Sequence, residues 1–270
     1  MQVGEPTLKI KKISDDKYHS VGGFNLQDPP SSLISASLLK DAYDRGLYES
    51  ILQKREIDED TRELFRLGTL IHLYILEPDE FDKKYYIGAY DPLETREQVE
   101  SEIGDLLEGF KKEIELKYPN ISDGEGAELA IIGEYDGVFV KSKLDKMVMI
   151  DNGYIVITDV KSTRLPMAKV KRDKQGRLWE IAREIDEYHI DLQMAFYAKL
   201  AVEAYRQRTG TTYEVICELL FCSKADGKTR LIRLSPEKME AGNEKLGRIW
   251  NDVKEFTQFG IGRVEKALLV

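Results

Sequence analysis

The sequence predicts an α/β fold in which helices flank a mixed central β-sheet. Runs rich in β-branched and aromatic residues occur in the middle of the chain and again near its end, and long amphipathic segments surround them. The 270 residues are enough to bury one large core. We expect a single domain over residues 31–270 with a helical insertion around 91–120, preceded by a polar N-terminal arm over residues 1–30.

Helices are expected where apolar residues recur with helical spacing between capping and breaking residues. Ser35 or Ser37 can cap a helix that runs to about Gln53. Ser235 followed by Pro236 is typical of a helix start. In chain order, the expected helices cover about 35–53, 58–76, 93–117, 179–209 and 235–259.

Strands are expected over 128–140, 143–150, 154–160, 213–222 and 229–234, with a further short strand over 81–89. Gly133 and Gly137 mark breaks or bulges in the first of them. Asn152 and Gly153 are a dipeptide that favours a tight hairpin turn, so the strands on either side of it should pair antiparallel.

This hairpin brings two carboxylates together. With the turn at 152–153, Asp145 and Asp159 lie nearly opposite each other. Lys161 shares a face with Asp159, because side chains two residues apart on a strand point the same way. Two close carboxylates repel unless a cation lies between them, and such oxygen-rich sites suit Mg²⁺ or Mn²⁺. The pattern predicts metal-assisted phosphodiester hydrolysis, while the alternative is an exposed hairpin with paired charges.

The spacing of Asp145 and Asp159-Val160-Lys161 resembles the PD-(D/E)xK nuclease motif. Leu144 stands where that motif has proline, but the proline is not a metal ligand. Further segments in the same order resemble RecE-type (exonuclease VIII-like) recombination nucleases. They are an opening segment over 34–39, a histidine-containing segment over 66–81, a glutamate at position 128, and a helix over 188–197 that is also similar to one in RecB-like nucleases.

The resemblance implies a restriction-endonuclease-like core and assigns roles to particular residues. The implied metal ligands are His72, Glu128, Asp145, Asp159 and the carbonyl of Val160. The implied catalytic groups are Asp145, Asp159, Lys161 and Gln193, with Tyr197, Lys143, Ser162 and Thr163 as supporting or DNA-contacting residues. The metal is expected to be Mg²⁺, with Mn²⁺ able to replace it.

The resemblance also implies an activity: 5′-to-3′ exonuclease action on duplex DNA ends, beside a single-strand annealing recombinase and often as a ring-like homo-oligomer. The alternatives are another PD-(D/E)xK nuclease, such as an endonuclease or a single-strand exonuclease, and a non-catalytic DNA-binding protein of the same fold. Individual residues have alternatives too. His72 could be a packed core residue, Gln193 and Tyr197 a polar stripe on a surface helix, and Glu128 a solvent-facing side chain.

Charge, cysteine content and hydrophobicity indicate which ligands, cofactors and cellular location to expect. The net charge is −9, yet residues 141–177 hold ten Lys and Arg against four Asp, so we expect a local positive channel beside the site. The two cysteines, Cys217 and Cys222, are too few for the four-cysteine iron–sulfur cluster of some related nucleases. No signal peptide is visible at the start, and no run approaches the roughly 18 apolar residues of a membrane span, so a cytoplasmic location without a membrane partner is expected.

Overall fold

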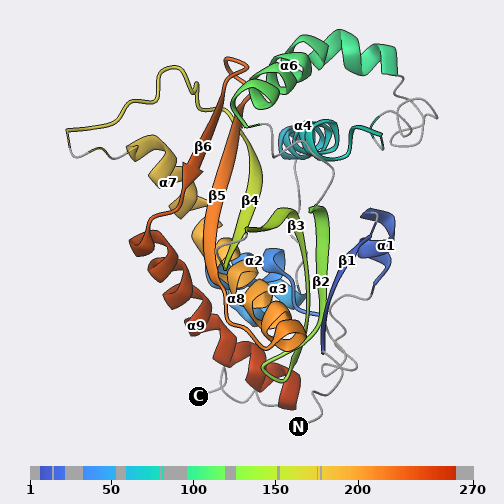
Figure 1. Ribbon diagram of the computed structural model, residues 1–270, viewed down its shortest axis with the longest axis vertical. Helices are drawn as coiled ribbons and strands as arrows, with labels where there is room; N and C mark the ends of the chain where they lie inside the picture. Colours follow the sequence, from blue (N-terminus) through green and yellow to red (C-terminus); the bar gives the residue numbers. More distant parts are fainter. Residues whose placement is uncertain are drawn as a thin grey trace.

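The computed structural model describes residues 7–13, 15–21, 33–52, 59–79, 81, 96–118, 126–150, 153–174, 176 and 178–259. Its centre is a six-stranded sheet in the order β1-β2-β3-β4-β5-β6 (Figure 1). The strands are β1 (Leu8–Lys12), β2 (Ala127–Tyr135), β3 (Val138–Ile150), β4 (Tyr154–Thr163), β5 (Glu214–Ser223) and β6 (Thr229–Arg233). Neighbouring strands are antiparallel except β4 and β5, which are parallel, so the predicted mixed sheet is confirmed.

Helices cover both faces of this sheet (Figure 1). They are α1 (Asp15–Ser20), α2 (Ala36–Arg45), α3 (Leu47–Leu52), α4 (Glu59–Leu76), α6 (Arg96–Lys117), α7 (Trp179–Glu187), α8 (Ile190–Thr209) and α9 (Pro236–Phe259). One hydrophobic cluster joins α2, α7, α8 and α9 to the sheet, and a second joins α4 and α6 to it. The parallel pairing of β4 and β5 requires a long crossover, which α7 and α8 provide.

Helix α6 covers the edge strand β6. Glu113 accepts hydrogen bonds from the backbone N–H (2.7 Å) and the hydroxyl (2.9 Å) of Thr229. Tyr118, which follows α6, accepts one from the backbone N–H of Leu231 (3.2 Å). Exposed edge strands invite pairing with other chains, and these side chains occupy the donors of β6 instead.

At the other edge, β1 lies within the segment that we expected to be a polar arm. It pairs antiparallel with β2 over its whole length, and Leu8 is buried. Its sequence alternates apolar Leu8 and Ile10 with lysines, which is the pattern of a strand with one buried face.

Two expected helices are each divided into two. Gly46, with φ of 86°, ends α2 before α3 begins, and His189, with φ of 47°, separates α7 from α8. The strand expected over 128–140 also divides, because β2 turns into β3 at Asp136 and Gly137. The strand expected over 81–89 lies outside the described residues except for Phe81, which is helical and buried.

The predicted hairpin register is confirmed. The pairs between β3 and β4 run from Ile150↔Tyr154 to Lys146↔Thr158. Gly153 adopts a positive φ of 82° at the turn, whereas Asn152 lies outside the described residues. Continued by one residue, this register places Asp145 opposite Asp159. Within the described part of the chain, no helix is long and apolar enough to cross a membrane.

Candidate active site

The backbone is irregular where β2 and β3 pass the site. Pairs flank Glu128 on both sides, at Ala127↔Lys146 and Leu129↔Leu144, but Glu128 is not paired with Asp145. Glu128 has a positive φ of 55°, which is uncommon for a residue with a side chain. Sparsely populated conformations of this kind persist only where the surrounding structure maintains them, and they are concentrated at functional sites.

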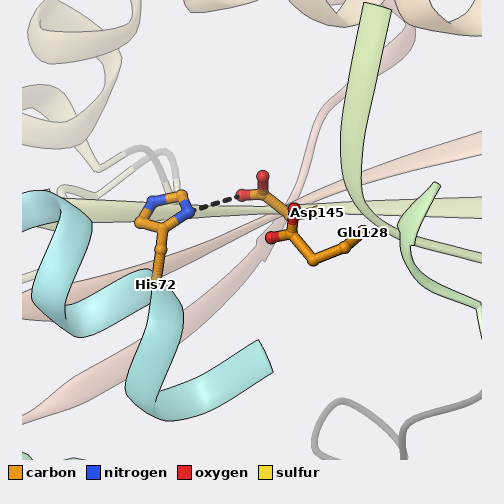
Figure 2. Close-up of side chains that lie close together, drawn as sticks. All are labelled: His72, Glu128 and Asp145. Atoms are coloured by element: carbon orange, nitrogen blue, oxygen red, sulfur yellow. Dashed lines mark ion pairs between the residues drawn. The ribbon is translucent and has the colours of Figure 1, made fainter. Parts of the chain in front are cut away.

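Three potential metal ligands meet beside this irregularity. One donor atom from each of His72, Glu128 and Asp145 lies within 4.8 Å of the others. Figure 2 shows the His72 ring, carried by α4, facing the Asp145 carboxylate, with the Glu128 carboxylate alongside; the His72 Nδ1 atom is 3.5 Å from Asp145 Oδ2. His72 is not a fully packed core residue, because 31% of its side chain is exposed. Glu128 is buried, so the solvent-facing alternative is wrong.

Asp145 lies where β3 and β4 separate. The ladder of backbone pairs ends at Lys146↔Thr158, and beyond it the Asp145 Oδ2 atom accepts a hydrogen bond from the backbone N–H of Val160 (2.6 Å). The backbone of Val160 also forms a hydrogen bond with His72. The fork between the two strands therefore holds Asp145, His72 and the Val160 peptide together.

The electrostatics of this fork favour a bound cation. Burial, and then the charge of Asp159, raise the pKa of Asp145 to about 8. Burial, and then the charge of Asp145, raise the pKa of Glu128 to about 7. Burial, and then the charge of Lys161, lower the pKa of His72, so its imidazole is neutral and able to act as a ligand. A divalent cation would remove the repulsion between these carboxylates, and the donor set therefore fits Mg²⁺ or Mn²⁺.

Asp159 belongs to a second, adjoining group of contacts. Its buried Oδ2 atom lies 2.5 Å from the Lys161 Nζ atom and forms an ion pair with it. Its Oδ1 atom accepts a hydrogen bond from Gln193 Nε2 (3.0 Å), which also donates to the Tyr197 hydroxyl (2.9 Å). Gln193 and Tyr197 are both 7% exposed, so the alternative of a polar stripe on a surface helix is wrong.

Opposing effects set the charge of Lys161. Burial lowers the pKa of this lysine, but the charges of Asp159 and Asp145 outweigh burial and raise it above its usual value. Lys161 is therefore protonated at neutral pH and acts as a fixed positive charge beside the two carboxylates. Burial, and then the charge of Asp159, raise the pKa of Tyr197 well above its usual value, which keeps this hydroxyl neutral.

Lys40 of α2 is a site residue that the sequence analysis missed. Its Nζ atom donates to Gln193 Oε1 (3.0 Å), the same oxygen that accepts from Lys161 (3.3 Å). Burial, and then the charge of Lys161, lower the pKa of Lys40 to about 8. One signal was available: Lys40 is one helical turn after the buried Ala36 and so lies on the inward face of α2.

The remaining residues that we expected to support the site lie either beside the potential metal ligands or along a cleft. Lys143 contacts the Glu128 carboxylate and lies 3.9 Å from Glu77 Oε2, a second carboxylate that was not expected from the sequence. Ser162 and Thr163 line a cleft of about 550 Å³ that also includes Lys40, His72 and Lys161. The Thr163 hydroxyl donates to Glu184 Oε2 (2.9 Å).

The basic tract contributes less to this cleft than its charge balance suggested. Of its described members, only Lys161 and Arg164 line the cleft. Lys141 instead donates to the Val21 carbonyl (2.8 Å), and Lys146 is buried in β3. Arg183 and Lys224, from outside the tract, line the cleft as well.

Comparisons with known proteins agree with this fold. No curated protein matches the chain significantly. The fold is similar to the crystal structure of a protein from Eubacterium rectale named "Putative exonuclease", with a TM-score of 0.54 and 17% sequence identity. The match covers 92% of this chain and 87% of that protein. At that identity the likeness shows the fold alone, which is α/β and restriction-endonuclease-like. The structure of SSO0001 is 13% identical over 78% of this chain and 83% of its own, and its TM-score of 0.27 is too low to support an argument.

The family comparison covers most of the sequence. Residues 35–260 match the model of the family described as a PDDEXK-like domain of unknown function (DUF3799). That range contains the cluster of potential metal ligands, the hairpin, Lys161 and Gln193. The chain therefore belongs to this PDDEXK-like family.

Proposed function

We propose that the protein is a divalent-metal-dependent deoxyribonuclease that hydrolyses DNA phosphodiester bonds in the cleft between α4 and the α7–α8 junction. The observation that carries this proposal is the arrangement at the fork of β3 and β4. A cluster of potential ligands, His72, Glu128 and Asp145, adjoins the Asp159–Lys161 ion pair. Membership of a PDDEXK-like family supports the same reading.

The residues have distinct roles in this proposal. His72, Glu128 and Asp145 would hold the cation, with Asp159 and the Val160 carbonyl as neighbouring oxygen donors. The bound cation supplies positive charge that makes a water molecule easier to deprotonate and stabilises negative charge on the phosphate. Lys161, being protonated, orients the attacking water and stabilises the developing negative charge.

Gln193 and Lys40 act around this centre. Gln193 holds Lys161 and Asp159 in position, because its amide oxygen accepts from the lysine and its amide nitrogen donates to the carboxylate. Lys40 has no ion pair with a carboxylate in the part of the chain that the structure describes, so a phosphate oxygen of the substrate is the partner that we assign to it.

The resemblance to RecE-type nucleases supports a more specific activity than DNA hydrolysis in general. That activity is 5′-to-3′ exonuclease action on duplex ends, in recombination, beside a single-strand annealing protein and with assembly into a ring. One assay tests the proposal: incubation of the protein with Mg²⁺ and end-labelled linear duplex, covalently closed circular duplex and single-stranded DNA. Release of mononucleotides from linear duplex alone, beginning at the 5′ end, is the expected result.

Other outcomes of this assay select the alternatives. Cleavage of circular DNA would make the protein an endonuclease, and degradation of single strands alone would make it a single-strand exonuclease. DNA binding without any cleavage would support the non-catalytic DNA-binding protein. The complete set of Asp145, Asp159 and Lys161 argues against that last outcome.

A further inference from the structure

Two aromatic side chains are exposed on the walls of the proposed active-site cleft. Phe65 of α4 is 60% exposed, and Tyr188, which follows α7, is 57% exposed. Both line the cleft that contains His72 and Lys161. Aromatic side chains normally bury most of their surface, so two exposed rings in one cleft indicate a ligand with an apolar or aromatic face.

The helix geometry of α4 fixes the position of Phe65. It lies seven residues before His72, so the two side chains share a face and are separated by about 10 Å along the helix axis. Gly68, between them, packs against β4, because a methyl group there would lie 3.4 Å from Ser162 Oγ. A separation of about 10 Å corresponds to roughly three stacked bases.

Tyr188 is held on a different element by the turn that follows it. His189 adopts a left-handed conformation, and its Nε2 atom lies 2.6 Å from Asp44 Oδ1. The His189 ring also packs edge-on against Tyr43, with centroids 4.7 Å apart. These contacts hold the junction between α7 and α8 in place. They therefore also hold Tyr188, which is next to His189 and five residues before Gln193.

The charges around the cleft are suited to a nucleic-acid backbone. Five basic side chains line it: Lys40, Lys161, Arg164, Arg183 and Lys224. Three acidic side chains also line it, and all of them come from α7: Glu180, Glu184 and Glu187. Basic grooves that carry exposed aromatic rings are typical of proteins that bind single strands, because every base can stack on a ring.

We propose that the cleft takes one unpaired DNA strand, with bases next to the scissile phosphate stacked on Phe65 and Tyr188. This inference rests on the proposed nuclease function and specifies its substrate at the moment of cleavage. A duplex end must separate before its strand reaches Lys161. Stacking on the two rings offsets part of the free energy that unpairing requires.

Single-strand affinity gives the first test. The Kd of the protein for a fluorescein-labelled single strand of twelve thymidine nucleotides is measured by fluorescence anisotropy in EDTA, so that no cleavage occurs. Phe65→Leu and Tyr188→Leu should each weaken binding by about 5-fold to 150-fold, whereas Phe65→Tyr and Tyr188→Phe, which keep the ring, should retain the affinity. Phe139→Leu is the matched control, because Phe139 is 44% exposed on β3 and does not line the cleft.

Abasic nucleotides give the second test. Each position near the labelled end is made abasic in turn, and kcat/KM in Mg²⁺ is measured for the wild type and the two leucine variants. At the stacked positions the abasic change should lower the wild-type value and have little effect on the matching variant. The wild-type protein should also cleave a duplex with an unpaired end faster than a duplex with a blunt end.

These measurements separate this inference from the proposed function. Cleavage that shows no coupling between an abasic position and either ring would overturn the stacking proposal and leave the nuclease proposal intact. Equal losses of affinity in Phe139→Leu would overturn it as well. A wild type that cleaves nothing in Mg²⁺ would contradict the nuclease proposal, while the anisotropy series would still report on the two rings.

Discussion

At the scale of single residues, Gln193 connects the proposed catalytic groups to one another. Its amide nitrogen contacts Asp159 and Tyr197, and its amide oxygen contacts Lys161 and Lys40. Both ends of the amide are therefore used, with donors facing acceptors and the acceptor facing two cations. Such supporting contacts fix the orientation of groups that act directly on a substrate.

Lys40 carries the first residue-scale prediction. Lys40→Met should raise the Kd for DNA and reduce by about one the slope of log K against log salt concentration, because one phosphate contact is lost. Lys40→Arg should largely keep both values, since it retains the charge. The measurement is a salt titration of DNA binding in EDTA.

Lys199→Met is the control for this titration, because Lys199 is exposed on α8 and does not line the cleft. A salt slope that is the same in Lys40→Met as in the wild type would show that Lys40 supports Gln193 and does not contact phosphate.

The sequence predicted some of these residues and not others, for a physical reason. Asp145, Asp159 and Lys161 could be placed by counting from a turn, because pairing within a hairpin is local and the side chains alternate. Its spacing from Ala36 could place Lys40 on the inward face of α2, but which side chains it meets there depends on how α2 packs against the sheet and α8, and no local pattern encodes that packing. The positive φ of Glu128 is likewise a property of the folded sheet, although the resemblance to RecE-type nucleases did indicate the residue.

At the scale of elements, the close packing of α8 against α9 positions Gln193. A methyl group on Gly242 of α9 would lie 2.2 Å from the backbone oxygen of Asp191, near the start of α8. Lys245, also on α9, forms an ion pair with Asp191 (2.8 Å). Helix α9 therefore fixes the first turn of α8, where Gln193 is located.

This packing gives the element-scale prediction. Gly242→Ala should lower the free energy of unfolding by about 1–3 kcal/mol, because the added methyl group overpacks the contact, and it should reduce cleavage by moving Gln193. Gly247→Ala is a matched control on the same helix, where nothing lies within 4 Å of the new methyl group. It should raise stability by about 0.5–1 kcal/mol, as expected for alanine in a helix.

Urea unfolding of the two variants checks this prediction. If Gly242→Ala and Gly247→Ala had the same free energy of unfolding, the contact between α8 and α9 could accept the added methyl group at no cost, and the prediction would be wrong.

The division of the long helices also shows where sequence patterns stop being informative. Gly46 gave a visible signal for the end of α2, because glycine readily adopts its positive φ. His189 gave none, since its left-handed conformation depends on tertiary contacts with Asp44, Tyr43 and Lys245. The order and type of the main elements could be predicted, but this break in the crossover helix could not.

At the scale of the whole molecule, the buried carboxylates couple stability to pH and to metal. In the metal-free protein the pKa of Glu128 is raised to about 7 and that of Asp145 to about 8, above their usual values near 4. The folded state therefore binds these protons more tightly than the unfolded state. Their contribution to stability is full below about pH 4 and is lost as the pH rises through about 7 to 8.

The corresponding prediction compares melting temperatures with EDTA and with Mg²⁺ between pH 5 and 9. The increase produced by Mg²⁺ should be small at pH 5 and grow as the pH rises through 7 to 8, because the metal binds only the deprotonated carboxylates. Asp145→Asn should remove most of this pH-dependent increase. An Mg²⁺ effect that is the same at pH 5 and pH 9 would contradict the proposed ligands.

The most direct test of the central claim is the rate of cleavage of linear duplex DNA by Asp145→Asn and Asp159→Asn in Mg²⁺. Both substitutions keep the shape of the side chain and remove its charge, so circular dichroism should show an unchanged fold. We expect each variant to lose at least about 10²-fold in turnover, the scale for losing one charge-stabilising group. Wild-type cleavage rates in either variant would contradict the proposed active site.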